Sequence, residues 1–98
     1  MPVNNENSRT LHNASVLSIT SANTSQSVFA AVPRNYILIQ NVSDTDMYLG
    51  IGFVPTVGGG ILLRANGGGW SAEDDFVPAG AVNIICAGAG KAFVALQG

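Results

Sequence analysis

The chain has 98 residues, enough for one domain, and combines 47% hydrophobic residues with only 10% charged residues and a net charge of −2. Its four basic residues are scattered along the sequence, so it lacks the clustered basic patch that neutralises nucleic-acid phosphates, and we expect no direct binding to nucleic acid. Average soluble chains carry about 25% charged residues, and we therefore expect part of the apolar surface to be buried against other chains.

The first thirteen residues are polar, rich in asparagine and without hydrophobic periodicity. This pattern predicts a flexible N-terminal arm over 1–13, followed by a single β-domain over 14–98. The arm lacks the apolar segment of a secretion signal, and no stretch is long and apolar enough to span a bilayer. We therefore expect synthesis in the cytoplasm without secretion, and no membrane partner.

Two short strand signals follow the arm. Residues 15–20 alternate between apolar and polar side chains, as a half-buried strand does. After a polar loop over 21–25, residues 27–32 are predicted to form a second strand. Pro33 ends that strand, because proline has no amide donor for the sheet.

The strongest strand signal is Asn35–Asn41, which is aromatic, β-branched and apolar on both faces near its middle. These properties predict a central strand. A turn over 42–46 then leads to a return strand over 47–53, so the two strands are predicted to form a hairpin.

The return strand has large apolar side chains at alternate positions, and we predict that these belong to the core. They are Met47, Leu49, Ile51 and Phe53. The intervening positions include Gly50 and Gly52, which leave one face bare. We expect another backbone segment or an aromatic ring to lie close to that face.

The C-terminal half continues with short strand signals separated by glycine-rich turns. The predicted strands cover 61–64, 70–73, 81–87 and 92–97. An Asn-Gly pair in the turn over 65–69 is a hairpin cue, and the last two strands are predicted to pair as a hairpin across 88–91. Seven to eight short strands at roughly ten-residue spacing indicate an all-β fold, an antiparallel β-sandwich or jelly-roll-like barrel.

The sequence has one histidine, His12 in the arm, and one cysteine, Cys86 in an apolar strand. Nucleophilic catalysis needs a rigid hydrogen bond between nucleophile and base, which a histidine in a flexible arm does not supply. A zinc site needs three or four ligands. We expect Cys86 to be a buried, inert thiol, and we expect no enzymatic activity, no metal and no cofactor.

Two acidic clusters have two interpretations. Residues 44–46 and 73–75 supply carboxylates that are suitable calcium ligands. Ordinary turn chemistry, in which aspartate side chains accept backbone N–H bonds, is the favoured interpretation. The glycine runs 58–60 and 67–69 are not phosphate loops, because neither is followed by the required Lys-Ser/Thr pair.

From Arg34 to the C-terminus the sequence resembles small structural proteins of tailed phages, the capsid decoration (cement) and head-fibre-base proteins. The residues that carry this resemblance are Arg34–Ser43, Asp46–Gly52 and Val77–Ala87. The resemblance covers about two-thirds of the chain. It implies a β-sandwich or jelly-roll module, commonly trimeric, that contacts neighbouring capsid subunits from outside, and it carries no catalytic residues.

These observations together predict a virion structural protein that binds the major capsid protein at the capsid surface, is made in the host cytoplasm, and assembles with itself as a homotrimer. The predicted interface residues are Val3, Arg9, Leu11, Arg34 and Trp70. The alternative is a receptor- or carbohydrate-binding module of a phage fibre or tail. That alternative would use Trp70, Tyr48 and the acidic loop over 73–75.

Overall fold

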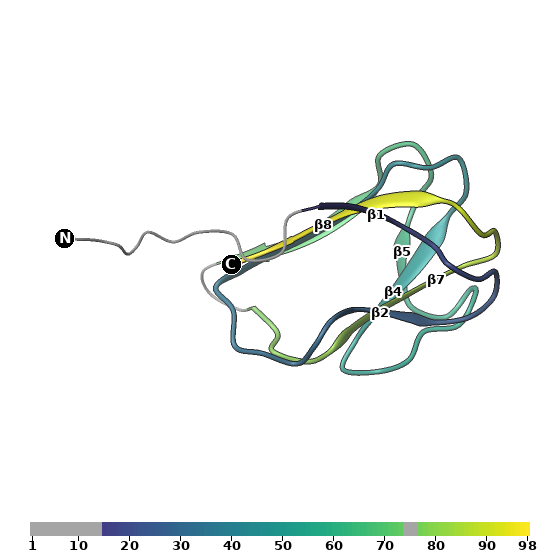
Figure 1. The fold of residues 1–98 in the computed structure, drawn as a ribbon. Helices are drawn as coiled ribbons and strands as arrows, with labels where there is room; N and C mark the ends of the chain where they lie inside the picture. Colours follow the sequence, from purple (N-terminus) through teal and green to yellow (C-terminus); the bar gives the residue numbers. More distant parts are fainter. Residues whose placement is uncertain (1–14, 74–76) are drawn as a thin grey trace.

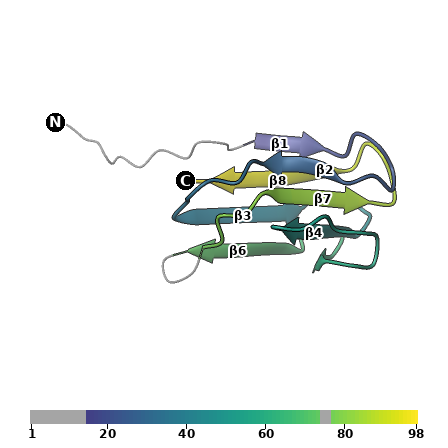
Figure 2. The same ribbon diagram turned by 90° about the horizontal axis from the view of Figure 1, so that it is seen from below.

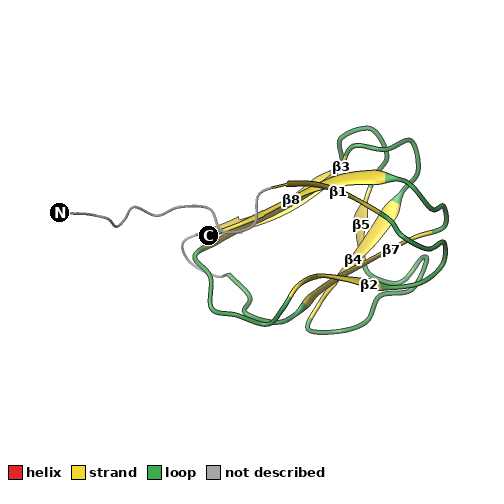
Figure 3. Ribbon diagram, in the orientation of Figure 1, coloured by secondary structure: helices red, strands yellow, loops and turns green. Residues whose placement is uncertain are grey.

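The computed structural model describes residues 15–73 and 77–98, and these residues form strands and loops without a helix (Figure 3). The predicted arm over 1–13 lies outside the described residues. The eight strands are β1 (Ser15–Ser18), β2 (Gln26–Phe29), β3 (Tyr36–Asn41), β4 (Met47–Ile51), β5 (Ile61–Leu63), β6 (Gly69–Glu73), β7 (Val82–Cys86) and β8 (Ala92–Gln97).

The strands form two antiparallel sheets of four, in the orders β1-β8-β3-β6 and β2-β7-β4-β5, which face each other (Figure 1). The first strand pairs with the last, the second with the seventh, the third with the sixth and the fourth with the fifth. This nested pairing is the topology of a jelly roll. It confirms the predicted all-β sandwich of short antiparallel strands.

Strand β3 lies inside its sheet, between β8 and β6, which confirms the predicted central strand. Its side chains alternate along the strand, and Ile37, Ile39 and Asn41 are fully buried between the sheets. At the start of β3, the N–H groups of Asn35 and Tyr36 donate to the carbonyl of Gly98. The C-terminus therefore lies at the end of the sandwich where β3 begins (Figure 2).

The three predicted hairpins are wrong. Strands β3 and β4, β5 and β6, and β7 and β8 each lie in different sheets, and among the described strands only β4 and β5 are consecutive neighbours. The turn chemistry at 66–67 was predicted correctly, since Asn66 has φ 64° and Gly67 has φ 115°. A tight turn reverses the direction of the chain. The same reversal can connect two paired strands of one sheet or two strands that lie in different sheets.

The core contains Met47 and Leu49 of β4 as predicted, and Ile51 packs against it half-buried. Phe53 does not belong to the core, because its side chain is 48% exposed. The strand ends at Ile51, and Gly52 then adopts φ 83°. This left-handed conformation interrupts the alternation of side chains that the prediction had extended to Phe53.

The bare face predicted beside Gly50 is covered by a backbone segment. A Cβ atom at Gly50 would lie 2.5 Å from the carbonyl oxygen of Phe53 and 2.8 Å from Cδ of Pro55. The chain after β4 therefore folds back across the outer face of its own strand, and Pro55 is fully buried there. The second glycine, Gly52, has nothing within 4 Å of such a Cβ and serves the turn instead.

Asn41 connects the two sheets with a fully buried side chain. Its Nδ2 donates to the carbonyls of Thr45, at 2.8 Å, and of Leu63 on β5, at 2.9 Å. Its Oδ1 accepts from the N–H and the hydroxyl of Ser43, at 2.9 and 2.7 Å. Because all four hydrogen-bonding positions of the amide are occupied, its burial carries no desolvation penalty from an unsatisfied group.

We predict that Asn41→Ala lowers the free energy of unfolding by about 2–4 kcal/mol, because it leaves buried carbonyls and the Ser43 N–H without their partner. Chemical denaturation of the purified chain measures the loss. Gln40→Ala is the matched control, since the half-buried Gln40 side chain forms one recorded bond, to the Gly67 carbonyl, and should cost less than about 1 kcal/mol. Equal losses in the two variants would contradict the assigned role of Asn41.

Candidate binding surface

The predicted interface residues are not gathered on one surface among the described residues. Val3, Arg9 and Leu11 lie outside the described residues, as does His12. Arg34 is buried, with 8% exposure, and Trp70 is half-buried on the edge strand β6.

The Arg34 guanidinium connects three segments at the end of the sandwich where β3 begins. Its Nε donates to Oε1 of Gln97 on β8 at 2.7 Å, and its Nη2 donates to the Ala30 carbonyl at 3.0 Å. Its Nη1 donates to the carbonyls of Pro78 and Gly80. Burial lowers the pKa of this guanidinium from its ordinary value. The side chain therefore stabilises the fold and leaves little surface for a partner.

Trp70 and Tyr48 do not form one aromatic platform. Trp70 stands opposite the buried Ile39 in the β3–β6 ladder and packs against the core from the inner face of its sheet. Tyr48 lies between Met47 and Leu49, which are both buried, so it faces outward from the other sheet. The carbohydrate-binding alternative named these two side chains together, and the fold separates them.

A group of exposed apolar side chains follows β4, and we call it the 53–62 patch. It comprises Phe53, Val54, Val57 and Leu62, which are 48%, 70%, 46% and 40% exposed. The loop that carries the first three is fixed in place, since Thr56 and Gly59 exchange backbone hydrogen bonds and Pro55 is buried. Leu62 pairs with Tyr48 on the outward face of the β4–β5 ladder.

The 53–62 patch was not predicted from the sequence, because Phe53 was assigned to the core and the following residues to an ordinary loop. A signal was present in the composition of that loop. Valine at positions 54 and 57, among proline, threonine and glycine, is unusually apolar for an exposed connection.

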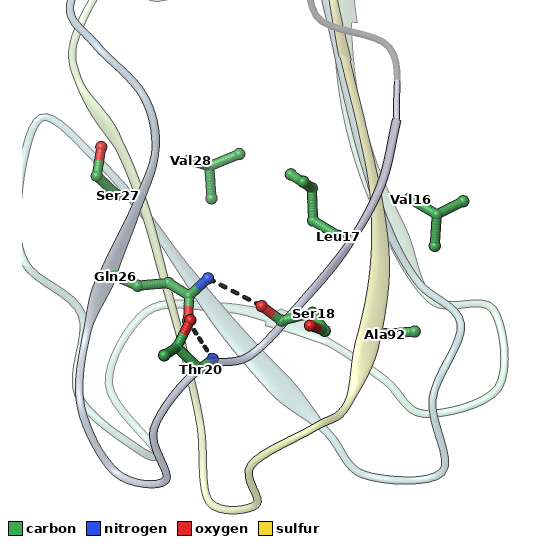
Figure 4. Close-up of a pocket in the computed structure, with 8 residues that line it drawn as sticks. All are labelled: Val16, Leu17, Ser18, Thr20, Gln26, Ser27, Val28 and Ala92. Atoms are coloured by element: carbon green, nitrogen blue, oxygen red, sulfur yellow. Dashed lines mark hydrogen bonds between the residues drawn. The ribbon is translucent and has the colours of Figure 1, made fainter.

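A second feature is an open groove of about 590 Å3 between the edge strands β1 and β2 (Figure 4). Leu17 and Val28 point towards each other across it, whereas Val16 points away. The Gln26 side chain bridges the groove, because its Oε1 accepts from the Thr20 N–H and its Nε2 donates to the Ser18 carbonyl, at 2.8 and 3.1 Å. No charged side chain lines the groove among the described residues.

Val28 faces the groove because β2 is irregular at this position. The pairing of β2 with β7 runs from Ser27 opposite Asn83 directly to Phe29 opposite Val82, so Val28 is an extra residue in the strand. Such a bulge changes the direction of the side chains that follow it. Phe29 is buried in the core, while Val28 packs against the core and lines the groove.

The acidic cluster at 44–46 has the geometry of turn chemistry. Oδ1 of Asp46 accepts from the Ala65 N–H at 2.7 Å. Oδ1 of Asp44 accepts from the Lys91 ammonium, at 2.8 Å, and from the Thr45 hydroxyl. The Lys91 hydrogen bond lowers the pKa of Asp44, and the same bond raises the pKa of Lys91.

The remaining candidates for chemistry give no assembled site in the described part of the chain. Three or more potential metal ligands do not come together there. In the second acidic cluster only Glu73 is described. Cys86 is fully buried, as predicted, and its thiol donates to the Asp46 carbonyl at 3.5 Å.

Comparison with protein-family models, with curated proteins and with solved structures gave no match to this chain. The described residues contain no helix that is long and apolar enough to cross a membrane.

We predict that Arg34→Lys lowers the free energy of unfolding by about 1–3 kcal/mol. A single ammonium keeps the charge but cannot reach acceptors that a planar guanidinium contacts in several directions. Thermal or urea denaturation measures the change. Arg64→Lys, at an exposed position, is the control and should stay within about 0.5 kcal/mol of the parent. If both variants behave alike, Arg34 does not stabilise the fold in the way its contacts imply.

Proposed function

We propose that this chain is a non-enzymatic structural protein of a phage virion, a cement or decoration protein that binds the major capsid protein on the outside of the capsid. In this role it strengthens the contacts between capsid subunits and acts as a homotrimer. The observation that carries the proposal is the 53–62 patch, four exposed apolar side chains carried by β5 and by the loop that crosses the outer face of β4. The resemblance of residues 34–98 to such proteins supplies the identity of the partner.

The distribution of charge supports binding through this patch. Only six charged residues lie in the described ranges. Arg34 is buried, Asp44 and Lys91 are paired with each other, and the Asp46 carboxylate accepts a backbone N–H. A surface with so few free charges is desolvated at low cost when another protein covers it.

The mechanism is mechanical. Each 100 Å2 of apolar surface removed from water contributes about 2.5 kcal/mol before the costs of association. A contact that spans two capsid subunits adds this free energy to the interface between them. Because a capsid repeats the same contact many times, a modest gain in each copy raises the resistance of the whole shell.

We predict that Val54→Asp and Val57→Asp each weaken binding to purified capsids of the encoding phage by about tenfold or more, because a charge would be buried without a partner. Co-sedimentation with capsids that lack the protein measures the effect. Ser71→Asp is the matched control: it adds the same charge at an exposed position of β6, in the other sheet, and should bind like the parent. A parent chain that fails to bind capsids, or patch variants that bind normally, would contradict the proposal.

A further inference from the structure

The outer edge of β1 presents backbone groups to the groove between β1 and β2. Ile19 bonds on the β8 side of the strand, since its N–H donates to the Lys91 carbonyl and its carbonyl accepts from the Gly90 N–H. In an antiparallel strand, successive residues direct their backbone groups to opposite edges. The N–H and C=O groups of Val16 and Ser18 therefore point towards the groove, as does the Thr20 N–H that bonds to Gln26.

The Gln26 side chain already occupies part of this edge in the manner of a neighbouring strand. One amide accepts from the Thr20 N–H and donates to the Ser18 carbonyl, two residues apart on the same edge. A residue of an added strand would form the same two kinds of bond. The N–H groups of Val16 and Ser18 and the Val16 carbonyl continue this line of hydrogen-bonding groups beyond Gln26.

The walls of the groove define what it can accept. Leu17 and Val28 supply apolar contacts from opposite sides (Figure 4), and serine and threonine hydroxyls lie at the Gln26 end. Among the described residues no charged side chain lines it. These features suit an extended, uncharged peptide of mixed apolar and small polar side chains, which would add to the sheet edge as a strand.

We propose that the groove receives an extended part of residues 1–14 from a second copy of this chain. This inference rests on the self-assembly in the proposed function. The segment contains Val3 and Leu11 among asparagine, serine and threonine, and its two charged side chains, Glu6 and Arg9, lie outside the stretch 10–14 that directly precedes β1. Fourteen extended residues reach up to about 46 Å, which is ample for a strand beside the four residues of β1.

The connection of residues 1–14 to β1 would allow a closed assembly. Residues 1–14 lead directly into β1, which is one wall of the groove. Each copy can therefore give its segment to the next copy and receive one from the previous copy. Such a head-to-tail interface closes into a ring when the rotation between copies allows it, and a trimer is one such ring.

Val16→Pro in the full chain tests the inference. Proline removes the groove-facing N–H of Val16 and leaves the β1–β8 ladder intact, because that N–H does not face β8. We expect the trimer of the parent chain, measured by sedimentation or light scattering over a range of concentrations, to dissociate at least about tenfold more readily in this variant. Val16→Thr, which keeps the N–H and the β-branched shape, should assemble like the parent.

Two further measurements keep the result interpretable. Ser18→Pro removes the next groove-facing N–H and should weaken assembly in the same way if Val16→Pro proves unstable. A synthetic peptide of residues 1–14, added in excess to the unsubstituted chain, should compete for the groove and dissociate the trimer, whereas a scrambled peptide should not.

The possible outcomes separate this inference from the proposed function. Trimers that resist both proline substitutions and the peptide would overturn the groove as the acceptor while leaving self-assembly intact. A parent chain that is monomeric at every concentration would overturn both the exchange of segments and the proposed homotrimer. Capsid binding through the 53–62 patch is measured separately, and its loss would overturn the proposed function without affecting the groove.

Discussion

The fold depends on buried polar side chains that connect the two sheets at opposite ends of the sandwich. At one end the Asn41 amide joins the end of β3 to the carbonyl of Leu63 in the other sheet. At the other end the Arg34 guanidinium joins Gln97 of β8 to Ala30, just after β2. Apolar contacts alone tolerate several relative positions of two sheets. Hydrogen bonds from one rigid planar group to fixed carbonyls are compatible with far fewer relative positions of the two sheets.

Most connections between strands cross from one sheet to the other, and the positions of these loops therefore depend on side chains such as Asn41 and Arg34. In a sheet built from hairpins, each turn positions two strands that already bond to each other. Here every connection except that between β4 and β5 crosses from one sheet to the other among the described strands. The loops at both ends must therefore be positioned by contacts of their own, and Asn41 and Arg34 supply many of them.

The sequence was sufficient to predict where strands occur and insufficient to predict which strands pair. Alternation and turn residues are local properties, and they located β3, β7 and β8 closely. Which strands pair depends on whether consecutive strands form a hairpin or lie in different sheets. Packing over the whole chain determines this, and a local sequence pattern does not contain it. Phe53 shows the same limit on a smaller scale, because a single left-handed glycine at 52 ended an alternation that the sequence pattern alone would have continued.

The binding surfaces were harder to predict, because exposure is a property of the assembled fold. Arg34 and Trp70 were predicted from the sequence to be interface residues. In the structure the Arg34 side chain donates its hydrogen bonds to acceptors inside the fold, and Trp70 packs against the core. The two candidate surfaces are a backbone edge, which no residue type marks in the sequence, and the 53–62 patch, whose only sequence signal is a loop that is unusually apolar.

The groove and Leu62 of the 53–62 patch lie at opposite edges of one sheet, and this separation has a consequence for the proposed assembly. The order β2-β7-β4-β5 places the groove beside β2 and Leu62 of the 53–62 patch on β5. If a chain has only one contact surface, a closed oligomer buries that surface between the copies and leaves none for another partner. With the groove engaged between copies, the patch on each copy would not be used by that contact, so the proposed trimer would carry three patches. Several weak apolar contacts made together bind far more tightly than one alone, because the second and third contacts form at high effective concentration. Under the proposed function, a trimer with three such patches would therefore attach more firmly to a lattice of matching symmetry than a single chain would.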